Sequence, residues 1–199
     1  MPFSIIAGGG LSFLSYTQTR KSELNEQAIT LKASVSRPID QAQRWKWGIN
    51  GFGTLLPFNS SVSGLQLRFL GLNGRVSRVL TAPGSRLEAS LAVGIYYLTT
   101  LGASSGIGNV SGPQVFPEVS WAIDQSNCIY GYFKFSPVNS GFRFLQLSNR
   151  ELALGSSWSH RLDSGHPVSM TLDSSDLSLN LSGVQVSTHT LTLGAGYGF

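Results

Sequence analysis

Apolar and small polar residues alternate along most of the chain. Between positions 87 and 93 the odd positions carry Leu87, Leu91 and Val93, whereas the even positions carry Glu88 and Ser90. A period of two residues is typical of a β-strand with one apolar face, and we find no stretch with a helical period. The pattern therefore predicts an all-β protein.

The alternation divides the chain into ten segments, separated by turn residues. The expected strands are 3–18, 27–38, 43–58, 63–80, 85–101, 114–124, 128–138, 141–148, 150–172 and 177–199. The apolar parity changes between Phe69 and Leu70, which predicts a β-bulge there. The charged stretch 20–26 is expected to be a loop, and short turns are expected at 37–42, 81–84, 124–127 and 148–150. If segments 128–138 and 141–148 are misassigned, the strand count falls to eight.

The composition changes the meaning of these strands. Only 12% of the residues are charged and 41% are apolar, whereas a soluble surface usually carries roughly 25–35% charged residues. No run of about 18 apolar residues exists, which excludes a helical membrane protein. Alternation at this composition is typical of a transmembrane antiparallel up-and-down β-barrel, formed here by one domain over 1–199. An even number of strands places both termini on the periplasmic side.

Several other classes of function are excluded or disfavoured. The single Cys128 excludes an internal disulfide framework, and a net charge of +4 without a basic run gives no reason to expect a nucleic-acid partner. We predict no cofactor. No export signal is visible before Phe3, so we expect a mature form or an excised domain.

The last strand carries the most family-specific pattern. Thr192, Gly194, Tyr197 and Phe199 place an aromatic residue at the end of the chain and another two positions before it. This ending resembles the terminal strand of small bacterial outer-membrane β-barrel proteins from Gram-negative cells, and its spacing also resembles the sorting signal of mitochondrial barrels. The resemblance implies an outer-membrane location and contact with outer-membrane lipids and lipopolysaccharide. It also implies that the barrel-assembly machinery reads Gly194, Tyr197 and Phe199 as an insertion signal.

The same parity holds on both sides of Asp173-Ser174-Ser175-Asp176. One apolar set is even-numbered and the other is odd-numbered: Leu152, Leu154, Trp158, Leu162, Val168, Met170 and Leu172 before the four residues, and Leu177, Leu179, Leu181, Leu191, Leu193, Ala195, Tyr197 and Phe199 after them. We interpret these four residues as the turn of one long hairpin, with paired residue numbers that sum to 349. Because about 9–11 residues cross a bilayer, residues 163–184 are expected to project beyond the membrane as an extracellular ribbon.

Placing the apolar parity toward lipid directs a set of charged residues into the lumen. These are Lys32, Lys46, Arg68, Glu88 and Glu118. They either form a constriction that selects solutes, or pair with one another in a lumen filled by side chains. The barrel is accordingly a small pore, or the membrane anchor of a larger envelope or secretion assembly that includes another envelope protein.

An alternative activity involves two histidines. His160 and His189 are opposite each other in the predicted hairpin and share the lipid-facing parity. With Ser159, or alternatively Ser157 or Ser187, as the nucleophile they suggest a lipid-modifying enzyme acting on lipid A acyl chains. The sequence offers no carboxylate in a convincing orienting position, so both residues are better explained as interfacial side chains. Together with His166 they lack the carboxylate or thiolate that usually completes a metal site, and we predict none.

Overall fold

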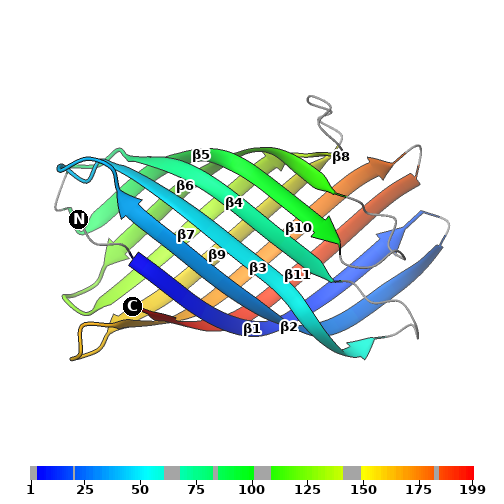
Figure 1. The fold of residues 1–199 in the computed structure, drawn as a ribbon, viewed down its shortest axis with the longest axis horizontal. Helices are drawn as coiled ribbons and strands as arrows, with labels where there is room; N and C mark the ends of the chain where they lie inside the picture. The colour runs from blue at the N-terminus through cyan, green and yellow to red at the C-terminus, as the bar shows by residue number, and fades with distance from the viewer. Residues whose placement is uncertain are drawn as a thin grey trace.

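The computed structural model describes residues 4–19, 21–60, 68–82, 85–100, 109–140, 149–181 and 184–199. Its strands are β1 Ser4–Gln18, β2 Lys21–Pro38, β3 Trp45–Ser60, β4 Phe69–Val79, β5 Leu87–Thr100, β6 Val110–Ala122, β7 Asn127–Pro137, β8 Asn139–Ser140, β9 Arg150–Arg161, β10 Pro167–Leu181 and β11 Val184–Gly198. All pairings are antiparallel, and those of β1 with β11 and of β5 with β6 close the sheet (Figure 1). The two-residue β8 pairs with β6 just beyond the end of β7. The chain is therefore a closed, ten-stranded, up-and-down barrel, as predicted, and no described residue is helical.

The count of ten is right, but two strands differ from the expected ones. The segment 150–172 is interrupted by a turn at 162–166, which separates β9 from β10. Asp173-Ser174-Ser175-Asp176 is not a turn but the middle of β10, which is paired with β9 on one side and β11 on the other. The predicted ribbon at 163–184 is therefore wrong, since 167–181 belongs to the barrel wall. The expected strand 141–148 lies outside the described residues.

Two further boundaries need correction. The charged stretch 20–26 is not a loop, because β2 begins at Lys21 and pairs with β1 from there. The expected turn at 148–150 is wrong, since Arg150 begins β9 opposite Pro137. Arg150 therefore lies at the end of the barrel where β7 ends, whereas the expected turn would lie at the other end, where β7 begins.

Both termini and three short turns lie at one end of the barrel, which we call the turn end (Figure 1). The turns are 39–44, 123–126 and 162–166; we call the opposite end the loop end. In the 123–126 turn, the Asp124 carboxylate accepts hydrogen bonds from the Asn127 side chain and from the backbone N–H of Ser126. These bonds hold the pKa of Asp124 below its ordinary value, so the turn is fixed by an ionised side chain.

The outer surface near the turn end is apolar and rich in tryptophan. Residues such as Leu91, Leu154 and Leu193 are 43–60% exposed on the outside of the wall. All four tryptophans lie near this end, at Trp45, Trp47, Trp121 and Trp158, and three of them are 41–51% exposed. Aromatic side chains at one level and aliphatic ones above them form the surface that lipid contacts in a membrane barrel.

Toward the loop end the polarity of the wall inverts. Leu172 is 44% exposed, but Leu177 and Leu179 on the same strand are 4% and 2% exposed and face the interior. Their outward neighbours there are polar, at Asp176 and Ser178. The strand alternates without interruption, so the change is one of sequence and not of backbone geometry.

The inverted region encloses an apolar core, which we call the loop-end cluster. It consists of Leu14, Tyr16, Leu24, Ala28, Phe69, Tyr96, Leu98, Val110, Val138, Leu177, Leu179 and Val186, each at most 5% exposed. The same inversion corrects the predicted bulge: Phe69 faces the cluster and Leu70 faces outward, with no irregularity in the pairing of β4.

Candidate functional site

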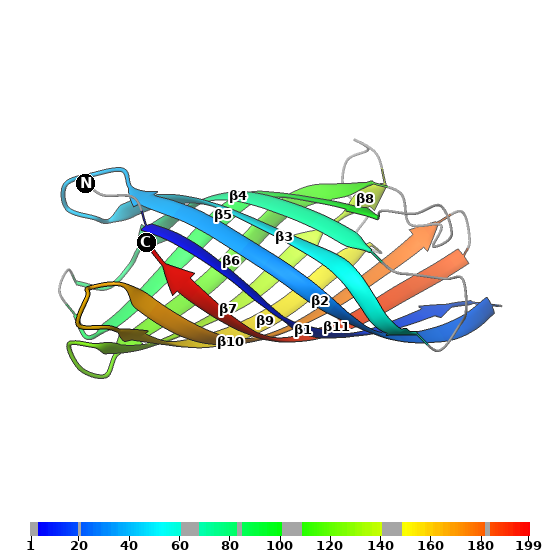
Figure 2. The same ribbon diagram turned by 60° about the horizontal axis from the view of Figure 1, so that its bottom comes forward.

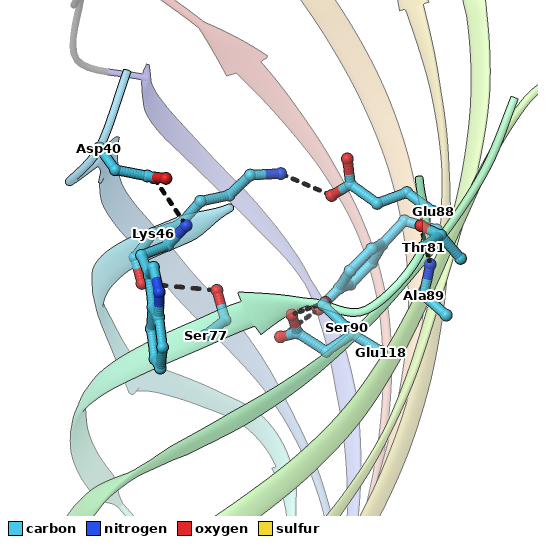
Figure 3. Close-up of polar contacts among 10 residues, drawn as sticks. Asp40, Lys46, Ser77, Thr81, Glu88, Ala89, Ser90 and Glu118 are labelled. Atoms are coloured by element: carbon cyan, nitrogen blue, oxygen red, sulfur yellow. Dashed lines mark hydrogen bonds and ion pairs between the residues drawn. The ribbon is translucent and has the colours of Figure 1, made fainter. Parts of the chain in front are cut away.

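The lumen below the loop-end cluster is lined by paired charges. At the mouth of the turn end, the Lys46 ammonium donates to Glu88 Oε1 at 2.5 Å (Figure 3). Lys46 comes from the start of β3 and Glu88 from the start of β5, so the pair spans the intervening β4. Both side chains are more than one-third exposed, and water screens this pair most among those in the lumen.

The next layer is centred on the Glu118 carboxylate. Glu118 Oε1 lies 2.5 Å from the Arg75 guanidinium and accepts the Tyr130 hydroxyl at 2.9 Å, while Oε2 accepts the Ser90 hydroxyl at 3.1 Å. Arg75 also lies over the Phe116 ring, 5.4 Å from its centroid. Three donors thus surround a carboxylate whose side chain is only 8% exposed.

Asp173 forms a second centre on β10, three strands from Glu118 on β6. It pairs with the Lys32 ammonium and accepts the Tyr132 hydroxyl at 2.8 Å. The Tyr132 ring lies over Gly155, where an added Cβ would be 2.4 Å from the ring and 2.2 Å from the Asp173 carboxylate. Glycine at 155 therefore leaves the space in which this hydrogen bond forms.

The most buried pair lies directly beneath the loop-end cluster. The Lys134 ammonium donates to Glu151 Oε1 at 2.5 Å, and Ser175 donates to the same oxygen at 2.9 Å. The side chains of Lys134 and Glu151 are 9% and 4% exposed. Lys134 also lies 4.5 Å from the centre of the Tyr96 ring, which joins the charged layer to the apolar one.

The structure brings together only part of the predicted charge cluster. Lys46 and Glu88 pair with each other, whereas Lys32 and Glu118 have partners that the sequence reasoning missed. Arg68 precedes β4 at the loop end, far along the wall from Lys46. The missed residues are Arg75, Tyr130, Tyr132, Lys134, Glu151 and Asp173. Each alternates with outward apolar residues, so the same parity rule that found Lys32 would have found them.

The two histidines do not face each other as predicted. His160 lies near the turn end, where its Nδ1 is 3.0 Å from Asn127 Oδ1 and its ring stacks on Trp158. Ser159 donates to the Cys128 carbonyl at 3.4 Å and takes no part in a His160 contact that the structure describes. The turn at 162–166 separates His160 from His189, which lies toward the loop end of β11.

His189 instead has a carboxylate partner that the sequence reasoning did not assign to it. His189 Nδ1 lies 2.7 Å from Asp176 Oδ1 on β10, and both side chains are more than half exposed on the outer face. The β-sheet register places Ser15 opposite His189 on the other side, and Asn25 opposite Ser15. Ser15 and His189 line one open hollow of about 420 Å³ together with Phe13, Asn25, Gln27 and Leu191.

The C-terminal residues close the barrel. The Phe199 N–H donates to the Ile5 carbonyl at 2.9 Å, and its ring meets Tyr197 edge to face at 5.0 Å. An added Cβ at Gly194 would lie 2.8 Å from the Thr171 hydroxyl, so this strand packs closely against β10. The reading of these residues by an assembly machinery stays a prediction.

Within the described ranges, no three His, Cys, Asp or Glu side chains are grouped so that they could hold a metal ion. The described part of the chain contains no helix that is long and apolar enough to span a membrane.

Comparison with known proteins identifies the fold. No protein-family model matches the chain, and no curated protein matches its sequence. Its structure is similar to the outer membrane protease OmpT from Escherichia coli, with a TM-score of 0.54 and 15% identity over 100% of this chain and 99% of that chain. It is also similar to a bacterial polysaccharide outer membrane secretin, with a TM-score of 0.50 and 11% identity over 96% of this chain and 69% of the other. The chain therefore has the fold of outer-membrane β-barrel proteins.

Proposed function

We propose that this chain is an integral outer-membrane barrel with a closed lumen, which anchors its loop end at the cell surface for another envelope protein. The observation that carries the proposal is the loop-end cluster, because it fills the interior of the barrel with apolar side chains at one end. The proposal has three parts, which are the position in the membrane, the closure of the lumen and the role of the loop end as an anchored surface.

The outer surface supports the membrane position. On β3 the outward apolar residues run from Trp45 to Leu55. Ten residues at about 3.3 Å each, tilted by about 40°, span about 25 Å, which is the height of the apolar band on a membrane barrel. The tryptophans then lie at the interface of the turn end, and the polar outward residues at the loop end lie in water.

Closure is supported by charge pairing and by packing. The four lumen lysine and arginine side chains of the ion pairs each have a carboxylate partner, so little net charge is left to attract a permeating ion. Above them, Tyr96 and Leu179 are each 2% exposed, and a hydrated solute would have to displace such side chains. A small pore, the other function expected from the sequence, needs a continuous polar path, which this cluster interrupts.

The loop end has the form expected of an anchored surface. The ribbons of β1–β2 and β10–β11 extend further than their neighbours at this end (Figure 2). Their outward residues are polar, for example Asn25 and Gln185, whereas most of their inward residues are apolar, with Glu26 and Thr188 as buried exceptions. A barrel wall with a polar exterior and its own apolar core can extend above the membrane into water. Its loop end then offers a rigid surface to a partner.

Planar-bilayer conductance tests the closed lumen. We expect purified barrel, shown to be folded by its heat-sensitive gel migration, to insert without stepwise current. The matched control carries Tyr96→Ala and Leu179→Ala, which remove two large side chains from the loop-end cluster. Folded protein of this double variant should pass more current than the wild type. Regular conductance steps from the folded wild-type barrel would overturn the proposal in favour of a pore.

A further inference from the structure

We propose that Ser15, His189 and Asp176 form a hydrolytic triad on the outer face of the barrel, which cleaves acyl esters of outer-leaflet lipids. The proposal rests on the membrane position argued above, but it does not depend on whether the lumen conducts.

The three side chains lie in one row across three neighbouring strands. Ser15 on β1 is opposite His189 on β11, and His189 is opposite Asp176 on β10. All three have the outward parity, and the Asp176 carboxylate lies 2.7 Å from His189 Nδ1. The carboxylate fixes the imidazole with Nδ1 toward β10, which leaves Nε2 directed away from Asp176, the side on which β1 carries Ser15.

The spacing suits proton transfer between Ser15 and His189. Residues that are directly opposite in an antiparallel pair have Cβ atoms about 5 Å apart, which is within reach of a serine hydroxyl and an imidazole. Both residues line the same hollow on the outer face, so the hydroxyl and the ring are accessible from one side.

The far side of Ser15 carries amide groups. Asn25 is opposite Ser15, and Gln27 is two residues further along β2; both line the hollow. Side-chain amides donate hydrogen bonds, and a donor next to the nucleophile can stabilise the oxyanion that forms during attack on an ester.

The position of the row selects the substrate class. The next outward row toward the turn end holds Phe13 and Leu191, and below it follow Leu11 and Leu193, which face lipid. The row of Phe13 and Leu191 also holds Gln27 on β2 and Ser174 on β10, so the triad lies next to the row in which the apolar band ends. In a lipid leaflet, the ester carbonyls occupy this same boundary, with the acyl chains on the apolar side.

The chemistry requires only the lipid and water. Ser15 Oγ attacks the ester carbonyl carbon while His189 Nε2 takes the hydroxyl proton, and an acyl–serine bond forms. The bond from the carbonyl carbon to the leaving oxygen breaks, and His189 returns the proton to that oxygen. Water then attacks the acyl-enzyme with His189 as the base, which releases the fatty acid and regenerates Ser15.

The test uses the folded barrel in two kinds of vesicle, one of phosphatidylethanolamine alone and one that also contains lipopolysaccharide. We expect release of free fatty acid from at least one of them, and the vesicle that responds identifies the source of the ester. We also expect a fluorophosphonate to phosphonylate Ser15 with loss of fluoride, as located by peptide mass. Release and labelling should fall to background in Ser15→Ala, and by roughly 100-fold or more in His189→Gln and Asp176→Asn.

Ser178→Ala is the matched control, because Ser178 is also on the outer face, two residues from Asp176 on β10. This variant should keep full release and labelling. The proposal is overturned if the folded, vesicle-inserted wild type shows no labelling at Ser15, or if release survives Ser15→Ala. Flotation with the vesicles is measured on every variant, so a barrel that fails to insert contradicts the membrane position and not the triad.

Discussion

Leu172 and Leu177 lie five residues apart on the same strand, β10, yet they face opposite sides of the barrel wall. Leu172 is 44% exposed on the outside, and Leu177 is 4% exposed inside the loop-end cluster. Both are paired in unbroken register with β9 and β11. The simplest physical reason is a change of solvent, from lipid outside Leu172 to water outside Asp176 and Ser178, because the apolar face of a strand turns away from water.

Replacing these two leucines by alanine should therefore lower the free energy of unfolding by different amounts. Leu177→Ala removes buried methyl groups from a packed core and should lower the free energy of unfolding by about 2–5 kcal/mol. Leu172→Ala, the control on the lipid face, creates no internal cavity and should cost less than half as much. Urea unfolding in vesicles measures both; equal costs would show that Leu177 is not part of a tight core.

The Lys134–Glu151 pair should be strongly coupled. Lys134→Met leaves a buried carboxylate without its cation, and we expect a loss of about 3–5 kcal/mol in the free energy of unfolding. Adding Glu151→Gln should recover much of this loss, since the unpaired charge is then removed. Lys46→Met at the exposed mouth should cost only about 0–1 kcal/mol. If the double variant were no more stable than Lys134→Met, the coupling would be absent.

Phe199 should matter more for assembly in cells than for the stability of the finished barrel. Phe199→Ala removes one ring contact with Tyr197 but keeps the backbone bond to Ile5. We expect normal folding in detergent and about a tenfold or greater fall in the amount of assembled barrel in the outer membrane, if the terminal aromatic residue is the insertion signal. Phe133→Ala, a lipid-facing control far from the C-terminus, should change neither quantity. A normal cellular level of Phe199→Ala would remove this role.

Much of the fold follows from alternation and composition, and two of the errors share one physical cause. If the apolar face of each strand points toward lipid, the alternate positions point into the lumen. This rule correctly places Lys32, Lys46, Glu88 and Glu118 inside the barrel. The same assumption fails beyond the membrane, where the apolar face turns inward. The change of parity between Leu172 and Leu177 therefore predicts a turn that does not exist, and the change between Phe69 and Leu70 predicts a bulge that does not exist.

The row of Ser15, His189 and Asp176 cannot be predicted from the sequence unless the pairing of the strands is known. Ser15 and His189 are far apart in the chain, and they become neighbours only because β1 pairs with β11 to close the barrel. The sequence pattern places Asp176 in a turn and therefore predicts no carboxylate near His189. The register between β10 and β11 places the Asp176 carboxylate directly beside the His189 imidazole.

The most direct test of the membrane boundary uses nitroxide labels at single cysteines along the outer face of β10, in a Cys128→Ser background. Labels at 168, 170, 172, 174, 176, 178 and 180 are placed in the vesicle-inserted barrel, and their collision rates with oxygen and with a water-soluble paramagnetic complex are compared. Labels at 170 and 172 should favour oxygen, which dissolves in lipid, and labels at 178 and 180 should favour the water-soluble complex. A profile without this reversal between 172 and 178 would contradict a strand that leaves the membrane where its polarity inverts.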